Sequence, residues 1–180
     1  MANSRRLFVR ARTIVTCDTH AAQNGITFDE LRRADGAAIV VEDGHIAQIV
    51  PNAQHNSAQA DEVMDLPDCV IFPGFVDAHA HPLYAGNREP DFAARNRGEK
   101  ALQGMLYTVE QTRQALLEPR RFYETTIRPR LQTMLAHGTT TLECKTGYAL
   151  HKPGEAELLD LIAAHKNDLD VPRLVPTFLG

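Results

Sequence analysis

The second part of the chain alternates short apolar segments with helical patterns, and this alternation limits the folds that the chain can adopt. Residues 69–76, 139–144 and 174–179 are apolar or β-branched and predict strands, the first of them interrupted by Pro73-Gly74. Residues 105–109 are a weaker strand candidate. Strands separated by helices pair in parallel through right-handed crossovers. Four strands can start a doubly wound sheet or half of an eight-stranded TIM barrel, and periodicity does not decide between them.

Two helices are predicted between these strands. Residues 120–137 place apolar side chains on one face and end before Gly138, although Pro129 predicts either a kink or a helix that begins only near Ile127. Residues 153–166 begin with Pro153 and also have an apolar face. The chain from residue 68 to residue 180 is therefore expected to be one α/β unit.

Residues 1–67 have a different character and predict a small antiparallel β unit. Residues 7–16 predict a strand, and residues 38–50 form two apolar runs around Asp43-Gly44, a pair typical of a tight hairpin. The polar residues 18–35 predict a surface insertion, and residues 52–62 predict a loop. A sheet of only a few strands leaves strand edges unpaired. This unit is therefore expected to need further strands or a partner to be stable.

His79 and His81 are the strongest candidates for chemistry. They follow an apolar strand, and residues two apart in an extended chain point to the same side. Two neutral imidazoles can therefore bind one metal ion, and Zn²⁺ or iron suits such ligands. The alternative is a pair of loop histidines that only make hydrogen bonds. The position at the carboxyl end of a strand favours the metal site, because α/β enzymes place their sites there.

Two further segments carry candidate site residues. Arg88 can donate two parallel hydrogen bonds to a substrate carboxylate, or it can pair with Glu89 or Asp91 at the surface. Lys145 is a possible charge partner or carbamylated metal bridge, and Glu143 lies two residues before it. Tyr148 follows a glycine and can reach a ligand with its hydroxyl, or it can simply pack on its loop.

Composition excludes several classes of partner. The net charge is −4 and no cluster of Lys or Arg stands out, so we expect no nucleic-acid or membrane partner. No apolar run approaches the roughly 20 residues that span a bilayer, and no signal peptide is recognisable. Three widely spaced cysteines do not predict disulfides. A cytoplasmic location is therefore expected.

Several segments resemble a known family. PGFVDAHAH at residues 73–81 resembles the first metal motif of the amidohydrolase superfamily. Four further segments resemble one family of this superfamily, the imidazolonepropionases. They are YAGNREP (84–90), MLAHGTT (134–140), KTGY (145–148) and TFLG (177–180). The resemblance implies that His79 and His81 are metal ligands and that Arg88 and Tyr148 contact the substrate.

The resemblance also implies a fold and a missing part. It implies the N-terminal half of a TIM-type (β/α)₈ barrel at residues 68–180, with four strands, after part of a small composite β-sandwich domain at residues 1–67. The remaining metal ligands and the acid/base residues are expected outside this chain. They would come from a missing segment or from a complementary half-barrel polypeptide, and we expect an oligomer.

The expected function is hydrolysis of a cyclic C–N bond with one zinc or iron ion. The family resemblance implies a small carboxylate-bearing ring as substrate, with 4-imidazolone-5-propanoate converted to N-formimino-glutamate. One alternative is a related deaminase that uses the same chemistry. Another is a non-catalytic half-barrel subunit that completes or regulates a partner. By this interpretation, residues 1–180 alone are expected not to be a catalyst.

Overall fold

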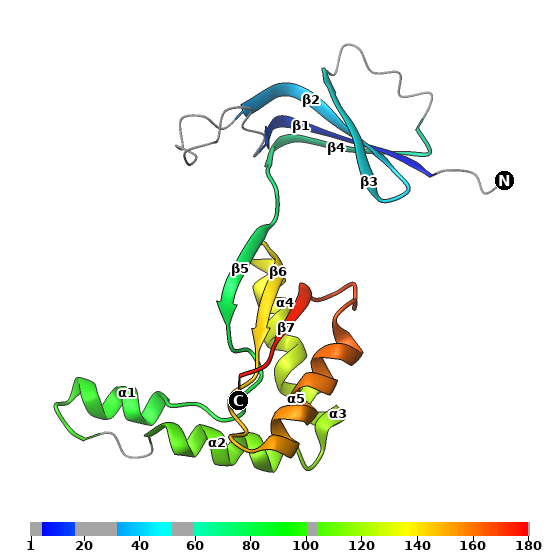
Figure 1. Ribbon diagram of the computed structural model, residues 1–180. Coiled ribbons are helices and arrows are strands. Elements are labelled where there is room, and N and C mark those ends of the chain that lie inside the picture. Colours follow the sequence, from blue (N-terminus) through cyan, green and yellow to red (C-terminus); the bar gives the residue numbers. More distant parts are fainter. Residues whose placement is uncertain (1–4, 17–31, 52–59, 101–103, 180) are drawn as a thin grey trace, which may run out of the picture. The chain divides into compact units, whose positions relative to one another are not determined.

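The computed structural model describes residues 5–16, 32–51, 60–100 and 104–179. They belong to two compact units, Met1–Pro73 and Gly74–Gly180. Figure 1 shows a β unit in blue and cyan and an α/β unit that runs from green to red.

The first unit contains one four-stranded sheet. Its strands are β1 (Arg6–Thr16), β2 (Arg32–Glu42), β3 (His45–Pro51) and β4 (Glu62–Ile71), in the order β3-β2-β1-β4. The pairs β1–β2 and β2–β3 are antiparallel, but β4 pairs with β1 in parallel. The prediction of a purely antiparallel unit is therefore wrong, because β4 enters the sheet beside the first strand rather than beside β3.

The predicted hairpin between β2 and β3 is confirmed. Asp43 has φ 50° and Gly44 has φ 80°, the left-handed conformations that a tight two-residue turn requires. Residues 32–35, expected in a surface insertion, belong to β2. The rest of that insertion before residue 32, and residues 52–59 of the predicted loop, lie outside the described residues.

The apolar segment 69–76 is two strands instead of the single strand predicted. Its first residues end β4 in the first unit, and β5 (Phe75–Ala80) begins the sheet of the second unit. Pro73 lies between them and has no N–H to give to a sheet. Gly74 follows, and a Cβ at this position would lie 2.2 Å from two side-chain atoms of Thr140.

The second unit is built on a parallel sheet with the order β5-β6-β7, where β6 is Thr139–Lys145 and β7 is Arg173–Thr177. Residues 105–109 do not form the fourth predicted strand, because they lie in helix α2 (Gly104–Ala115). Within the described part of the chain, this sheet therefore has three strands. Closure into a barrel stays a prediction.

The two predicted helical regions are present, at residues 119–136 and 152–165, whereas the helix at residues 89–96 was not predicted. Between β5 and β6 lie α1 (Glu89–Asn96), α2, α3 (Pro119–Phe122), a π-helical turn η4 (Tyr123–Ile127) and α4 (Arg128–Ala136). The π turn directly precedes Pro129, where a kink was predicted, since Pro129 cannot donate a helical hydrogen bond. Helix α5 (Lys152–His165) connects β6 to β7. In the described ranges, no helix is long and apolar enough to cross a membrane.

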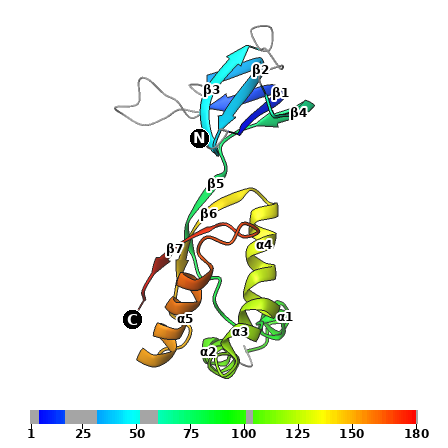
Figure 2. The same ribbon diagram turned by 90° about the vertical axis from the view of Figure 1, so that its right-hand side faces the viewer.

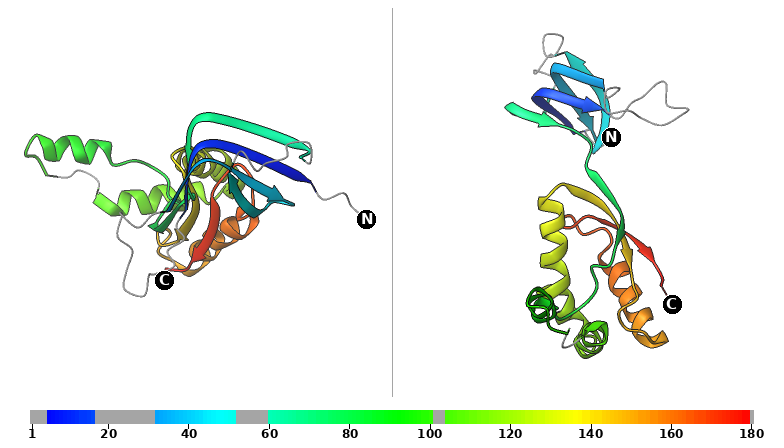
Figure 3. Two further views of the ribbon diagram at one scale, coloured as in Figure 1. Left: turned by 90° about the horizontal axis from the view of Figure 1, so that it is seen from above. Right: turned by 90° about the vertical axis from the view of Figure 1, so that its left-hand side faces the viewer.

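One face of the parallel sheet packs against α4 and α5 (Figure 2). Leu142 and Cys144 of β6 are fully buried there, together with Leu131 of α4 and Leu158 of α5. The right-hand view of Figure 3 shows this sheet from its other side. Because side chains alternate along a strand, Glu143 and Lys145 of β6 point away from the helices, toward that other side.

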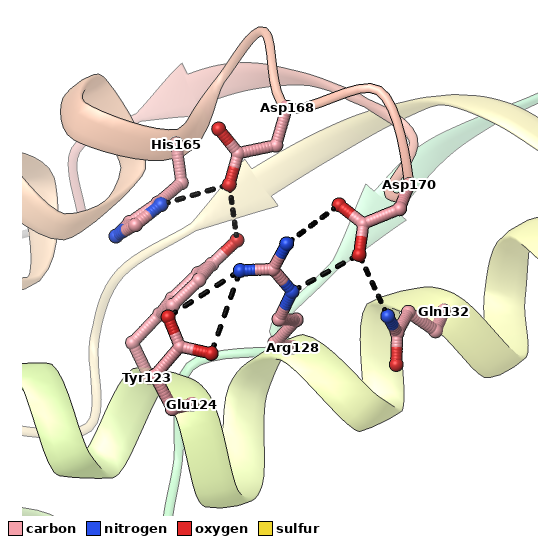
Figure 4. Close-up of polar contacts among 7 residues, drawn as sticks. All are labelled: Tyr123, Glu124, Arg128, Gln132, His165, Asp168 and Asp170. Carbon is pink, nitrogen blue, oxygen red and sulfur yellow. Dashed lines mark hydrogen bonds and ion pairs between the residues drawn. The ribbon is translucent and has the colours of Figure 1, made fainter.

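A polar network positions the segment that leads into β7 (Figure 4). Arg128 of α4 donates two parallel hydrogen bonds to Asp170, with distances of 3.0 and 2.9 Å from Nε and Nη2 to the carboxylate oxygens. The buried ring of Tyr123 stacks on His165, with ring centroids 3.5 Å apart, and Asp168 accepts a hydrogen bond from Tyr123. These contacts join the helices before β6 to the end of α5, and so they fix where β7 begins.

Candidate metal and substrate site

His79 and His81 lie at the carboxyl end of β5, as predicted. Their ring centroids are 5.6 Å apart, with an angle of 68° between the planes. His79 is exposed, whereas His81 is half-buried. The backbone N–H of His79 donates to Oδ1 of Asp77, two residues earlier in the strand. Two imidazoles in such close contact can reach one ion.

A backbone contact determines which nitrogen of His81 is available. Its Nδ1 lies 3.0 Å from the carbonyl oxygen of Thr146, which follows the end of β6. A carbonyl only accepts hydrogen bonds, so Nδ1 carries the proton and Nε2 keeps a lone pair. Metal-binding histidines characteristically hold their second nitrogen on a carbonyl or carboxylate in this way. The contact therefore suits His81 to metal binding.

Glu143 and Lys145 form an ion pair beside these histidines. Lys145 Nζ lies 2.8 Å from Glu143 Oε1, and the hydroxyl of Thr177 on β7 donates to the same oxygen at 2.9 Å. Hydrogen bonds from Lys145 and Thr177 lower the pKa of Glu143, and the charge of His79 lowers it further. Glu143 thus keeps a negative charge close to His79, and Lys145 is its ion-pair partner.

Tyr148 packs against His81. Its ring is perpendicular to that of His81, with centroids 5.8 Å apart, and it also contacts the ring of Tyr84 at 5.4 Å. The guanidinium of Arg130 on α4 stacks on the ring of Tyr84, with its Cζ 3.9 Å from the ring centroid. Arg130 also donates to the carbonyl oxygens of Pro82 and Tyr84. The loop after β5 and the loop after β6 therefore meet through these aromatic rings.

Arg88 lies at the N-terminus of α1 and pairs with a buried carboxylate. Its Nε lies 3.1 Å from Oδ2 of Asp91, whose side chain is only 3% exposed, while the Arg88 side chain is 39% exposed. The N–H of Gly104 donates to the same Asp91 oxygen at 2.9 Å. The ion pair that was weighed as an alternative is thus present. This ion pair is made through Nε of Arg88.

The structure brings together most of the predicted site residues. His79, His81, Glu143, Lys145 and Tyr148 lie at the carboxyl end of the parallel sheet, whereas Arg88 pairs with Asp91 and, among the described residues, makes no hydrogen bond, ion pair or ring contact with them. No group of three or more His, Cys, Asp or Glu suited to a metal is found in the part of the chain that the structure describes. The two histidines therefore fit a metal as a partial ligand set.

Sequence reasoning missed four residues that shape this site: Tyr84, Arg130, Thr177 and Glu155. The buried carboxylate of Glu155 accepts backbone hydrogen bonds from the loop that carries Tyr148. An acidic residue in the first turn of a helix is an ordinary signal for the helix dipole, so the sequence contains no sign of this second role.

Comparison with known proteins identifies relatives by sequence. No protein-family model matches the chain. Imidazolonepropionase of Cutibacterium acnes is 37% identical over 153 residues, which cover 84% of this chain and 36% of that protein. Imidazolonepropionase of Herpetosiphon aurantiacus is 33% identical over 186 residues, which cover 100% of this chain and 42% of that protein. The chain thus spans less than half the length of these relatives.

Solved structures with a similar fold are enzymes of the amidohydrolase superfamily. Atrazine chlorohydrolase from Arthrobacter aurescens, complexed with zinc, superposes with a TM-score of 0.60 at 16% identity. Guanine deaminase of E. coli superposes with a TM-score of 0.57 at 17% identity. Each match covers 97% of this chain and 36% of the other. At this identity, the similarity shows the fold alone.

Proposed function

The chain is homologous to the imidazolonepropionases of the amidohydrolase superfamily, and from this premise we propose that it forms part of a metal-dependent hydrolase opening a cyclic C–N bond. The proposed substrate is 4-imidazolone-5-propanoate and the product N-formimino-glutamate. In this reaction, water adds to the ring carbonyl carbon, the C–N bond breaks, and the leaving nitrogen takes up a proton. The observation that carries the proposal is the pair His79 and His81, with Nδ1 of His81 held by Thr146.

The metal would be held by His79 and His81, and zinc or iron suits their imidazole nitrogens. When bound, such an ion lowers the pKa of a coordinated water toward neutrality and so supplies a nucleophile. Catalytic zinc usually has three protein ligands. We therefore propose that a segment or a polypeptide outside the described residues supplies the other ligands and the acid/base groups.

Glu143 and Lys145 would tune the charge of the site. The Glu143 carboxylate stays ionised because Lys145 and Thr177 donate to it, and its negative charge favours a cation beside His79. Lys145 in turn is held by this ion pair and directed to the same edge of the sheet. We propose these roles rather than a carbamylated bridge for Lys145.

Arg88 and Tyr148 would bind the substrate. The Nη1–Nη2 edge of Arg88 would hold the propionate carboxylate, while Asp91 holds Nε and orients the guanidinium plane. Tyr148 would contact the imidazolone ring, since its own ring already packs on His81. The carboxylate of the substrate would thus be fixed at one point and its reacting ring at another.

The proposal is tested by incubating a purified protein that contains this chain with 4-imidazolone-5-propanoate. Mass spectrometry should show a product that has gained one water, and chelation of the metal should abolish its formation until zinc or iron is returned. No turnover of the imidazolone, with release of ammonia and net exchange of NH₂ for OH in an analogue that carries an exocyclic amino group on the ring, would identify a deaminase. No turnover in any metal-loaded sample, with the complementary polypeptide present, would support the non-catalytic subunit and contradict the proposal.

A further inference from the structure

A buried carboxylate lies beneath the loop that carries Tyr148. Glu155 is in the first turn of α5 and is only 3% exposed. Its Oε2 accepts the N–H of Gly147 at 2.6 Å, and its Oε1 accepts those of Ala149 and Leu150, both at 2.8 Å. One side chain therefore binds three backbone donors of a single loop.

These bonds outweigh the cost of burying the charge. Burial raises the pKa of Glu155, but hydrogen bonds from Thr146 and from the three backbone N–H groups lower it below its ordinary value. The carboxylate is therefore ionised at neutral pH. A charged acceptor makes stronger hydrogen bonds than a neutral one, so the loop is held firmly.

The loop needs such support because its backbone is strained. Gly147 has φ 116° and Leu150 has φ 51°, a left-handed conformation that costs free energy for a residue with a side chain. Tyr148 lies between these two positions. The N–H groups on both sides of it go to Glu155, so the direction of the Tyr148 side chain depends on that carboxylate.

The same loop also contacts His81 from two directions. The Thr146 carbonyl accepts the Nδ1 proton of His81, and the Tyr148 ring packs perpendicular to the His81 ring. Resting on the proposed function, we propose that Glu155 is a positioning residue, which holds the loop from Thr146 to Leu150 so that Tyr148 meets the substrate beside His81. Glu155 itself does not touch the reacting atoms.

The chemistry of the contact requires a glutamate. Glutamine has one oxygen and one NH₂ group, so in either orientation at least one backbone N–H would face another donor. Aspartate keeps the charge but is one methylene shorter, so it reaches fewer of the three donors. Glu155→Gln and Glu155→Asp therefore disturb the loop by different routes. Asp160→Asn is the matched control, because it removes an exposed carboxylate from the same helix.

The test measures kcat and KM for imidazolone hydrolysis in these three variants, using the protein that contains this chain. Glu155→Gln should lower kcat/KM by about ten- to a hundredfold, mainly through KM, because a displaced tyrosine binds substrate poorly. Glu155→Asp should fall between Glu155→Gln and the unchanged Asp160→Asn. In a Tyr148→Ala background, Glu155→Gln should add little. A purely structural role would lower the folded fraction and the apparent kcat while leaving KM unchanged, and that result would overturn the inference.

Amide hydrogen exchange separates this inference from the proposed function. In Glu155→Gln, the N–H groups of Gly147, Ala149 and Leu150 should exchange faster, while that of Leu142 in β6 stays protected. Failure of the wild-type protein to hydrolyse the ring would end the proposed function, and exchange would then decide the positioning role by itself. Unchanged exchange at these three amides would show that Glu155 does not hold the loop.

Discussion

Replacement of Arg88 by lysine tests whether this side chain recognises a carboxylate. Arg88 contacts Asp91 through Nε at 3.1 Å, so a lysine, which has one compact ammonium group, cannot bind Asp91 and a substrate carboxylate in the same way. A hydrogen bond to a charged group contributes roughly 1.5–3 kcal/mol. Loss of one such bond corresponds to a decrease of about ten- to a hundredfold in kcat/KM.

The assay compares two substrates to separate binding from structure. We expect Arg88→Lys to lower kcat/KM for the propanoate by this factor, and to change kcat/KM much less for the neutral carboxamide analogue. Any loosening of Asp91, which is buried, would affect both substrates alike. Equal losses on the two substrates would therefore refute the carboxylate role and leave Arg88 as a structural residue.

Arg97→Lys is the matched control for Arg88→Lys. Arg97, at the end of α1, donates two hydrogen bonds to the carboxylate of Glu99, at 2.8 and 2.9 Å, and both side chains are exposed. Exposed pairs of this kind contribute little to stability. The control should leave kcat/KM unchanged for both substrates, and the melting temperature of each variant shows whether the fold is intact.

Three further predictions concern the fold around the site. Gly74→Ala should destabilise the protein by about 1–3 kcal/mol in chemical denaturation, because the added Cβ overlaps Thr140. In a Thr140→Gly background the same change should cost much less, and additive costs in the double variant would contradict the clash. Leu131→Ala should cost about 2–5 kcal/mol by the same measurement, since Leu131 is fully buried between α4 and the sheet, and a change near zero would contradict this packing. Burial raises the pKa of Cys144 to about 12, so its thiol stays protonated at pH 8.5 and iodoacetamide should modify exposed Cys69 first; faster modification of Cys144, measured by mass spectrometry, would contradict its burial.

The sequence predicted a helix, strand or turn correctly where all the residues of the pattern belong to that one element. The hairpin at Asp43-Gly44, the helix α5 and the strand β6 depend on a few consecutive residues, and all three are present. The strand predicted at residues 105–109 is wrong, because a run of five residues does not distinguish a strand from part of a helix. In the full helix α2, the buried residues are Thr108, Val109 and Thr112, a helical spacing that a longer window reveals.

The boundary between the two units could not be predicted from apolar character. Residues 69–76 are apolar throughout, yet β4 ends at Ile71 in one sheet and β5 starts at Phe75 in another. Only the partners of each strand separate them, and these partners lie far along the chain. The Pro73-Gly74 pair was the local signal for this break.

The candidate site was predictable only in part, for the same reason. His79 and His81 share a face because of the two-residue repeat of a strand, which is visible in the sequence. The contact of His81 with Thr146 joins residues 65 positions apart, and no local pattern predicts it. Arg130 likewise acts through long-range contacts with Pro82 and Tyr84. The contacts of Glu155 are local, but they depend on the conformation of the loop from Gly147 to Leu150, which no pattern of residue types predicts.

The central claim is that His79 and His81 hold the metal of a hydrolase, and metal content measured together with activity tests it most directly. The protein that contains this chain, tested with the segment or polypeptide that supplies the other ligands, should retain stoichiometric zinc or iron and hydrolyse the imidazolone. The control His137→Ala, which changes an exposed histidine after α4, should do the same. The double variant His79→Ala/His81→Ala should lose the metal and the activity together while its melting temperature changes little. Full metal content in the double variant, with hydrolysis intact, would contradict the account.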